Sequence, residues 1–416
     1  MEKKENIKTQ VSEELSDAKA FAKATNIDDV KSGRWFISLL TKVAKTYDQN
    51  VRAEYFQKKY PGLPPDEIAD ILIGVTVKYA TIAGGIAGAA VTANQITALS
   101  TAGATVALMA GSIGVEMIFL ARIQMRLVLD ISVLYDIQLD PEDPEDILMI
   151  FGYALGVVPT ELIGKGLQKA AATGTQQAIK KYVSKGTLKA IQTFGKRIGM
   201  KILQRSIIKY AIPAVSAVVG STYNYYTTKT IGQISKAHLK NRGKVTEELR
   251  TLISRRIKYH IVFPAAVLFM AHADGKFTVE EKEFYKAVLS RLSLEDYEQE
   301  EFQKLLSSQE NILEAILEIE ETAIRENLIK VLSLMAVYDG ELASEESNFL
   351  IEVATKLDVT IDIKEIEKQT QDYRVIIKEN IFQKSSGIIK DAASSVGNSI
   401  SRTFSRGSNK KPEKEK

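Results

Sequence analysis

The sequence predicts an all-α fold. Its 416 residues include only nine prolines, so few positions interrupt a helix. Apolar residues recur at helical spacing along most of the chain, whereas the alternation of apolar and polar residues that is typical of half-buried strands is scarce. A chain of this length can form two or three domains.

The most apolar part of the chain is residues 81–121, which carry a single charged side chain, Glu116. The apolar character begins at Ile71, and residues 100–103 (STAG) supply a helix cap and a flexible glycine between two apolar halves. Each half holds about 20 residues, roughly the number that crosses a bilayer core. We therefore predict a helical hairpin over residues 71–121.

Small residues characterise this hairpin. Gly84 and Gly88 stand four residues apart on one helical face, and Ala107 and Gly111 repeat the spacing. Small residues in such positions let two helices approach closely, which matters most in lipid but also suits a tight water-soluble core. Two interpretations stay open, a hairpin that inserts into a membrane and a hairpin buried in a helical domain.

The two interpretations of the hairpin predict different surroundings for its single carboxylate. In a membrane, Glu116 would mark a functional or paired site. In a water-soluble core we expect it to pair with an arginine such as Arg122 or Arg126.

The chain before the hairpin is more polar. Residues 1–31 are charged and show no core-forming pattern, so we predict a polar N-terminal segment. A helix is expected from a cap at Ser32 to about Lys59, because its apolar residues share one face. Pro65 then suits the first turn of the next helix, where the following Asp66 is also favourable.

Charge is distributed unevenly, although the net charge is only +3. Residues 162–246 contain sixteen Lys and Arg and no Asp or Glu, whereas residues 247–370 contain fourteen basic and twenty-six acidic residues. Basic amphipathic helices suit an anionic membrane surface. Nucleic acid attracts the same charges, but no aromatic stacking platform or groove-reading motif accompanies them. A solvated face, or one balanced by the acidic half, is the third interpretation.

We expect the membrane contact to involve glycines and the carboxylate of the hairpin together with lysines and an arginine of the basic region. These residues are Gly84, Gly88, Gly111, Glu116, Lys180, Lys181, Lys196 and Arg197.

Three motifs in residues 65–245 resemble the EcsC family. They are the Gly/Ala-rich hairpin, an Asp-Pro turn before a helix that begins near Glu145, and residues 212–220 (IPAVSAVVG) followed by Asn224. The family often has glycine where Ser216 stands here, a difference that leaves the packing plausible. The resemblance implies a bacterial helical protein associated with a membrane, and it supplies no reaction or catalytic residue.

The acidic half contains an internal repeat. Residues 271–284 (AHADGKFTVEEKEF) align with residues 336–349 (AVYDGELASEESNF) at an offset of 65. Each copy is expected to form a helix, an Asp-Gly turn and a second helix, which Thr278 or Ser344 caps, with Glu281 completing a capping box. Both copies resemble the TerB domain, named for tellurite resistance, over about residues 255–370. This resemblance implies a compact helical domain with a role in stress response.

The repeat places acidic residues at matching positions of both copies. They are Asp274, Glu280, Glu281, Asp339, Glu345 and Glu346. Neither copy is an EF-hand, because Met270 and Met335 stand where the loop needs oxygen ligands. A divalent cation can still bind if the two copies meet, and the other interpretation gives these residues only capping and turn roles.

Four segments follow from these observations. They are a polar segment (1–31), an EcsC-like domain (32–246) with the hairpin 71–121 and the basic region 162–246, a TerB-like acidic domain (250–370) and a basic tail (371–416). The tail carries apolar residues at helical spacing among Ser, Gly and Asn. Its pattern is typical either of a lipid-sensing amphipathic helix or of a disordered chain.

The composition disfavours an enzyme. The chain has no cysteine, which removes thiol chemistry and zinc sites built on Cys, and its three histidines are scattered. No nucleophile with a base, phosphate loop or metal-ligand triad is recognisable, so we expect neither catalysis nor a resident cofactor. The N-terminus lacks an apolar signal segment, so we expect a cytoplasmic protein at the inner face of the cell membrane.

We therefore expect a membrane-associated stress-response or scaffold protein. Its EcsC-like part would lie at an anionic membrane, and its TerB-like part would engage an unknown protein partner or a cation. The alternatives are a protein that inserts its hairpin to form a pore, and a cation-dependent regulator or hydrolase that uses the acidic clusters.

Overall fold

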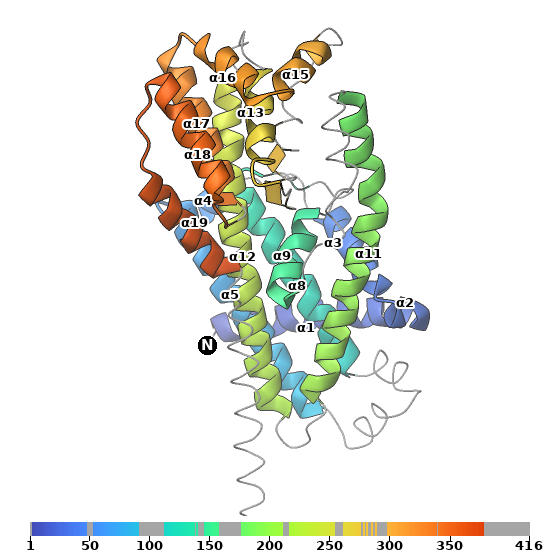
Figure 1. The fold of residues 1–416 in the computed structure, drawn as a ribbon. Coiled ribbons are helices and arrows are strands. Elements are labelled where there is room, and N and C mark those ends of the chain that lie inside the picture. The colour runs from blue at the N-terminus through green and yellow to red at the C-terminus, as the bar shows by residue number, and fades with distance from the viewer. Residues whose placement is uncertain are drawn as a thin grey trace, which may run out of the picture.

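The computed structural model confirms the all-α fold, since every described element is a helix (Figure 1). The structure describes residues 2–47, 53–90, 112–137, 139, 145–157, 176–210, 216–253, 261–275, 278, 280–281, 284–285, 288, 298–338 and 340–377.

The first helices pack on the core of the molecule. They are α1 (Glu2–Ala24), α2 (Ile27–Lys31), α3 (Arg34–Thr46) and α4 (Ala53–Lys59). The prediction that residues 1–31 lack a core is wrong, because Val11, Ala18 and Ala22 of α1 are buried. These three residues are small or moderate in size and are separated by charged positions. The sequence therefore shows only a weak apolar face on α1, although this face packs against α8.

The expected helix from Ser32 to Lys59 is also wrong. Ser32 ends α2, and its hydroxyl donates to the carbonyl of Asp28 at 2.6 Å. Gly33 follows with φ of +74° and begins α3 from a left-handed conformation. A Cβ atom at Gly33 would lie 2.0 Å from the carbonyl oxygen of Lys196, so the contact with a distant helix requires glycine at this turn.

Five longer helices form the body of the N-terminal half. They are α5 (Pro65–Ala90), α8 (Ser112–Leu134), α9 (Glu145–Leu155), α11 (Gln176–Tyr210) and α12 (Ser216–Ile253). The predicted start at Pro65 is confirmed. α12 has 38 residues and is therefore about 57 Å long, and in Figure 1 it runs through most of the height of the molecule.

α5 and α12 form an antiparallel pair along most of the length of α5. Lys236 of α12 pairs with Asp70 near the start of α5, at 2.8 Å. At the other end Gly84 approaches α12 so closely that a Cβ atom there would lie 2.5 Å from the carbonyl oxygen of Gly220. The predicted close approach at Gly84 therefore exists, but it joins the first arm of the hairpin to α12. Gly88 lies in the last turn of α5, and Gly111 lies outside the described residues.

The second half of the described chain is built around the two copies of the repeat, and the name repeat is used below for all the helices of this half. Its helices are α13 (Val262–Met270), α15 (Glu298–Leu306), α16 (Gln309–Leu317), α17 (Thr322–Tyr338), α18 (Ser344–Leu357) and α19 (Ile363–Ile377). The glycines of both Asp-Gly turns, Gly275 and Gly340, have φ of +74°, as the repeat predicts.

The two copies of the repeat interlock through aromatic rings. Phe284 of the first copy packs edge-on against Tyr338 of the second, with ring centroids 5.5 Å apart. Phe349 of the second copy packs against Phe269 of the first at 5.0 Å. Because each copy completes the core of the other, neither is a separate folding unit.

The predicted capping box of the first copy is present. The amide of Thr278 donates to the carboxylate of Glu281, and the amide of Glu281 donates to Oγ1 of Thr278 at 3.2 Å. In the second copy the cap is Ala343 rather than Ser344, and the carboxylate of Glu346 accepts from the amide of Ala343 at 2.8 Å. Alanine has no side-chain acceptor, so only half of the box survives.

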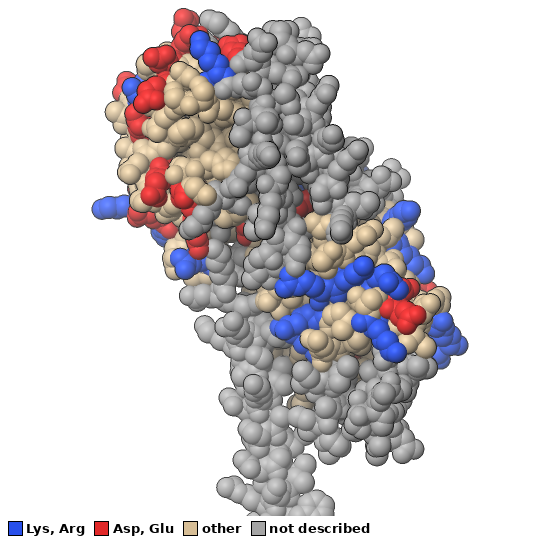
Figure 2. Space-filling model, turned by 45° about the vertical axis from the view of Figure 1, so that its right-hand side comes forward, with Lys and Arg blue, Asp and Glu red and all other residues tan. Residues whose placement is uncertain are grey.

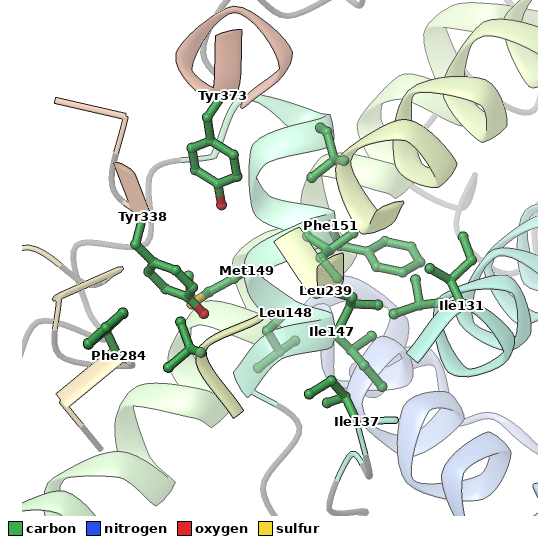
Figure 3. Packing of buried hydrophobic residues seen from close by; sticks show 14 of the residues in the cluster. Ile131, Ile137, Ile147, Leu148, Met149, Phe151, Leu239, Phe284, Tyr338 and Tyr373 are labelled. Atoms are coloured by element: carbon green, nitrogen blue, oxygen red, sulfur yellow. The ribbon is translucent and has the colours of Figure 1, made fainter. Parts of the chain in front are cut away.

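The two halves share one continuous core. The predicted boundary between residues 246 and 250 falls inside α12, and the boundary at 370 falls inside α19. Figure 3 shows residues of the repeat beside residues of the N-terminal bundle, among them Phe284, Tyr338, Tyr373, Leu148, Met149 and Leu239. The EcsC-like and TerB-like parts of the sequence therefore do not form two domains with separate cores.

Replacing Gly84 with Ala is expected to lower the free energy of unfolding by about 1–3 kcal/mol, because the new methyl group meets the backbone of α12. Gly74, on the same helix, has open space around its Cβ position, so Gly74→Ala is expected to stabilise the protein by up to about 1 kcal/mol. Urea unfolding of both variants measures the difference. Equal effects would contradict the close approach of the two helices.

Burial raises the pKa of Asp130 on α8 to about 6, although the hydroxyl of Tyr47 donates to its carboxylate at 2.8 Å. An acid whose pKa is raised by folding destabilises the protein as the pH rises from about 4 to above 6. Asp130→Asn is therefore expected to match the parent protein near pH 4 and to exceed its free energy of unfolding at pH 7.5 by up to about 3 kcal/mol. Urea unfolding at both pH values tests this, and a difference that is independent of pH would refute it.

Candidate functional site

A buried cluster of charged and polar side chains joins four helices near the end of the bundle that carries the hairpin. Lys209 of α11 donates to the carboxylate of Glu116 on α8 at 2.7 Å and to Oδ1 of Asn224 on α12 at 2.8 Å. The amide nitrogen of Asn224 donates to the same carboxylate and to the carbonyl of Ala80 on α5. The cluster therefore holds both arms of the predicted hairpin against α11 and α12.

The pairing of Glu116 was predicted, but its partner was wrong. Arg122 and Arg126 point to the other side of α8, where both bind Glu14 of α1. Glu116 pairs with Lys209 instead, which lies 93 residues away in the sequence. Local spacing could not identify this partner, because α11 reaches Glu116 only through the fold.

The cluster is almost completely removed from water. The side chains of Glu116 and Lys209 are each 1% exposed. Burial lowers the pKa of Lys209, and the carboxylate of Glu116 opposes this shift. The second carboxylate oxygen of Glu116 has no hydrogen-bond partner among the described residues. Such a pair stabilises the fold only while both partners are present.

Exposed apolar residues surround this end of the bundle. Ile86 of α5 is 53% exposed and Val218 of α12 is 67% exposed, and both lie within one turn of the Gly84–Gly220 contact. We call Ile86, Val218 and Tyr225 the apolar tip. Val218, Tyr225 and Lys229 are spaced seven and four residues apart, so they share one face of α12. The ammonium group of Lys229 lies 5.8 Å from the ring centroid of Tyr225.

One helix in the described part of the chain is long and apolar enough to cross a membrane, from Pro65 to Ala87. Buried helices of water-soluble proteins meet the same criterion, and Ala69, Ala80 and Ala83 of this helix are indeed buried. The helix is therefore compatible with both interpretations of the hairpin.

Part of the basic region is paired with acidic residues of earlier helices. Lys236 and Lys240 pair with Asp70 and Asp66 of α5, and Arg242 pairs with Asp146 of α9. For this part of α12 the partners come from α5 and α9 and not from the acidic C-terminal half, which the third interpretation of the basic region offered as one possibility, because α12 packs along α5 and beside α9.

The remaining basic residues lie mainly on α11. Arg197 is exposed and Lys196 is half-buried, whereas Lys180 and Lys181 lie in the first turns of the helix, where side chains are outside the description. Figure 2 shows Lys and Arg side chains gathered on the lower half of the molecule, on the side where α11 lies in Figure 1. Acidic side chains are more frequent on the upper half, which the repeat forms.

The two copies of the repeat meet at a cavity of about 310 Å³. Asp274, Glu281, Glu346 and the cationic Arg374 line it. Glu281 and Glu346 are used as helix caps, as one of the two interpretations of the acidic clusters expects.

The other acidic residues of the repeat have different surroundings. Glu280 is buried and accepts a hydrogen bond from Tyr153 of α9, and Glu345 is exposed and accepts one from Ser344. Asp339 lies outside the described residues. Within the described ranges no three or more His, Asp or Glu side chains are grouped to hold a metal ion. The cation site stays a prediction.

A second buried network, which local sequence patterns did not predict, joins the bundle to the repeat. Nε2 of His238 on α12 lies 3.2 Å from Oδ1 of Asp146, and Nδ1 lies 3.3 Å from the hydroxyl of Tyr373 on α19. Burial raises the pKa of Asp146, but Arg242 and His238 outweigh it and hold that pKa well below its usual range. His238 and Arg242 are four residues apart and therefore share one face of α12, and this spacing is the feature of the sequence that could have indicated a common partner.

Comparison of this chain with protein-family models, curated proteins and solved structures finds no match. The resemblances to the EcsC family and the TerB domain remain predictions from their motifs.

Replacing Lys209 with Met is expected to lower the free energy of unfolding by about 3–5 kcal/mol, because it leaves the carboxylate of Glu116 buried without its cation. The further change Glu116→Gln is expected to recover most of this loss. Lys229→Met is the control, and its effect should stay within about 1 kcal/mol because Lys229 is only partly buried. Equal losses for the two lysine variants, measured by urea unfolding, would show that the cluster is not needed for stability.

Proposed function

We propose that this protein is a membrane-associated scaffold without enzymatic activity. The apolar tip contacts an anionic bilayer, and the repeat lies at the far end of α12, where it engages a partner. The observation that carries the proposal is the exposure of Ile86, which belongs to the hairpin, and of Val218, which lies beside it, on a bundle whose other large apolar residues are mostly buried. Apolar residues grouped at one exposed end are typical of an interaction surface.

The order of residues along α12 supports a lipid surface as the partner of this end. From the tip inward, the shared face presents Val218, then Tyr225, then Lys229. At a bilayer, apolar side chains favour the acyl region, tyrosine favours the headgroup level, and lysine extends its ammonium group to lipid phosphates. A protein partner would not require this order.

The Glu116 cluster supports the same proposal. An unpaired charge near lipid would oppose the contact, because ionised groups are costly in hydrocarbon. Here Lys209 pairs with Glu116 inside the bundle, so the charge of Glu116 is not presented to lipid at this end. The basic face on the side of α11 adds attraction to anionic headgroups, each nearby Lys or Arg contributing about 1 kcal/mol.

The resemblances extend the proposal to location and biological role. The EcsC-like motifs suggest a bacterial protein at the inner face of the cell membrane, and the TerB-like repeat suggests a stress response in which a protein or a cation binds the repeat. The second candidate function is a pore formed by insertion of the hairpin, which the length and apolar character of residues 65–87 favour.

Flotation with vesicles tests the proposal. We expect the protein to co-migrate with phosphatidylserine-containing vesicles at low salt and to release no trapped dye. Ile86→Ser combined with Val218→Ser is expected to reduce binding about tenfold, because it removes exposed apolar area from the tip. Leu317→Ser with Ile351→Ser is the matched control, since these residues are also exposed but belong to α16 and α18.

The outcomes separate the candidates. Absence of binding to anionic vesicles, or equal losses for both double variants, would reject contact through the apolar tip. Dye release by the parent protein would favour the pore instead.

A further inference from the structure

A groove of about 980 Å³ lies between the two halves of the molecule. The start of α5, the second half of α12, α17 and the start of α19 form its walls. Apolar side chains from the repeat line one side, namely Ile329, Leu334, Ile361 and Ile366. An open groove of this size with an apolar wall is suited to the apolar face of a helix.

The rim of the groove is negatively charged. Its carboxylates are Asp66, Glu67, Glu247, Glu248, Asp362 and Glu365, against the three lysines Lys240, Lys244 and Lys330. An occupant should therefore combine an apolar face with basic residues.

The C-terminal tail has this combination. The structure describes the chain to Ile377, and the remaining 39 residues contain nine Lys and Arg and four Asp and Glu. Within residues 388–404 the charged residues are Lys390, Arg402 and Asp391. Between Ile388 and Phe404 an apolar stripe recurs every three or four residues, through Ile389, Ala392, Val396 and Ile400. This spacing is typical of a helix that docks in a groove.

The tail can reach the groove. The groove-lining residue Ile366 lies eleven residues before Ile377 on α19, a rise of about 17 Å. Residues 378–387 can span about 33 Å when extended, and the last of them is Gly387. The connection is therefore long enough to return the stripe to the start of α19.

We infer that residues 388–404 dock as an amphipathic helix in the groove between α5, α12, α17 and α19 of the same chain. The apolar stripe contacts Leu334 and Ile361, and Lys390 and Arg402 approach the acidic rim. A tether of this length gives the tail an effective concentration near millimolar, which favours it over a second copy of the chain. The inference rests on the groove and the tail alone and does not depend on the proposed membrane contact.

Docking of the tail covers apolar residues of both the groove and the tail in solution. It also joins the start of α5 to α19, so the tail acts as a strap across the two halves.

The absence of cysteine permits a disulfide test in the full-length chain. Thr360→Cys places a thiol at the groove and Ser395→Cys places one within the tail stripe. Thr322→Cys with Ser395→Cys is the matched control, since Thr322 is also an exposed threonine of the repeat but does not line the groove. In dilute protein under mild oxidation, the first pair should form an intramolecular disulfide at least about fivefold faster.

Further substitutions identify the contact. Leu334→Glu in the groove, or Ile389→Ser with Val396→Ser in the tail, should bring the two disulfide rates to parity. Leu317→Glu, on the exposed face of α16, should change neither rate. The tail variant leaves the described part of the chain intact, so it remains informative even if Leu334→Glu fails to fold.

Three results with the protein in solution would overturn the inference. They are equal rates in the parent pairs, rates that the tail variant leaves unchanged, and a disulfide that forms only between two copies of the chain. Preferential reaction of Thr360→Cys only after phosphatidylserine vesicles are added would also overturn it, because the docked state is assigned to the protein in solution.

Discussion

The antiparallel packing of α5 on α12 is the constraint on which most of the structure depends. Gly84 and Gly220 bring the two backbones together at one end, and Gly232 accommodates Ile73 nearer the other. Close approach leaves no space for larger side chains, so the interface is specified by small residues. It buries the first arm of the hairpin against a helix of the basic region, and it aligns Asp70 with Lys236.

Because α12 is long, it contacts helices of both halves of the molecule. Its first half packs in the bundle near the apolar tip, and its second half contacts α17 and α19 of the repeat. His238 lies between these regions and contacts Asp146 on one side and Tyr373 on the other. One continuous helix therefore contacts both the bundle near the tip and the repeat. This property suits a scaffold that connects a surface to a partner.

Ionic pairing inside the bundle explains why a strongly basic region is compatible with a compact fold. Each of several cations on α11 and α12 meets a carboxylate from an earlier helix, and the most buried of these pairs is Lys209 with Glu116. The buried pair also specifies the register of its helices, since a shift by one turn would leave Glu116 or Lys209 buried without its partner. Basic residues that are not used in this way gather toward the side of α11.

The sequence by itself determined the helical fold, the start of α5 at Pro65, the glycine turns of the repeat and the capping box at Thr278, because these features depend on local periodicity, φ angles and nearest neighbours. It also showed that Glu116 needed a partner.

Only the tertiary structure decided that this partner is Lys209, that α1 belongs to the core, that His238 connects the two halves and that the repeat and the bundle share one core. The physical reason is that burial and ion pairing depend on which helices pack together. Residues such as Glu116 and Lys209 are distant in sequence, and only helix packing brings them within 2.7 Å.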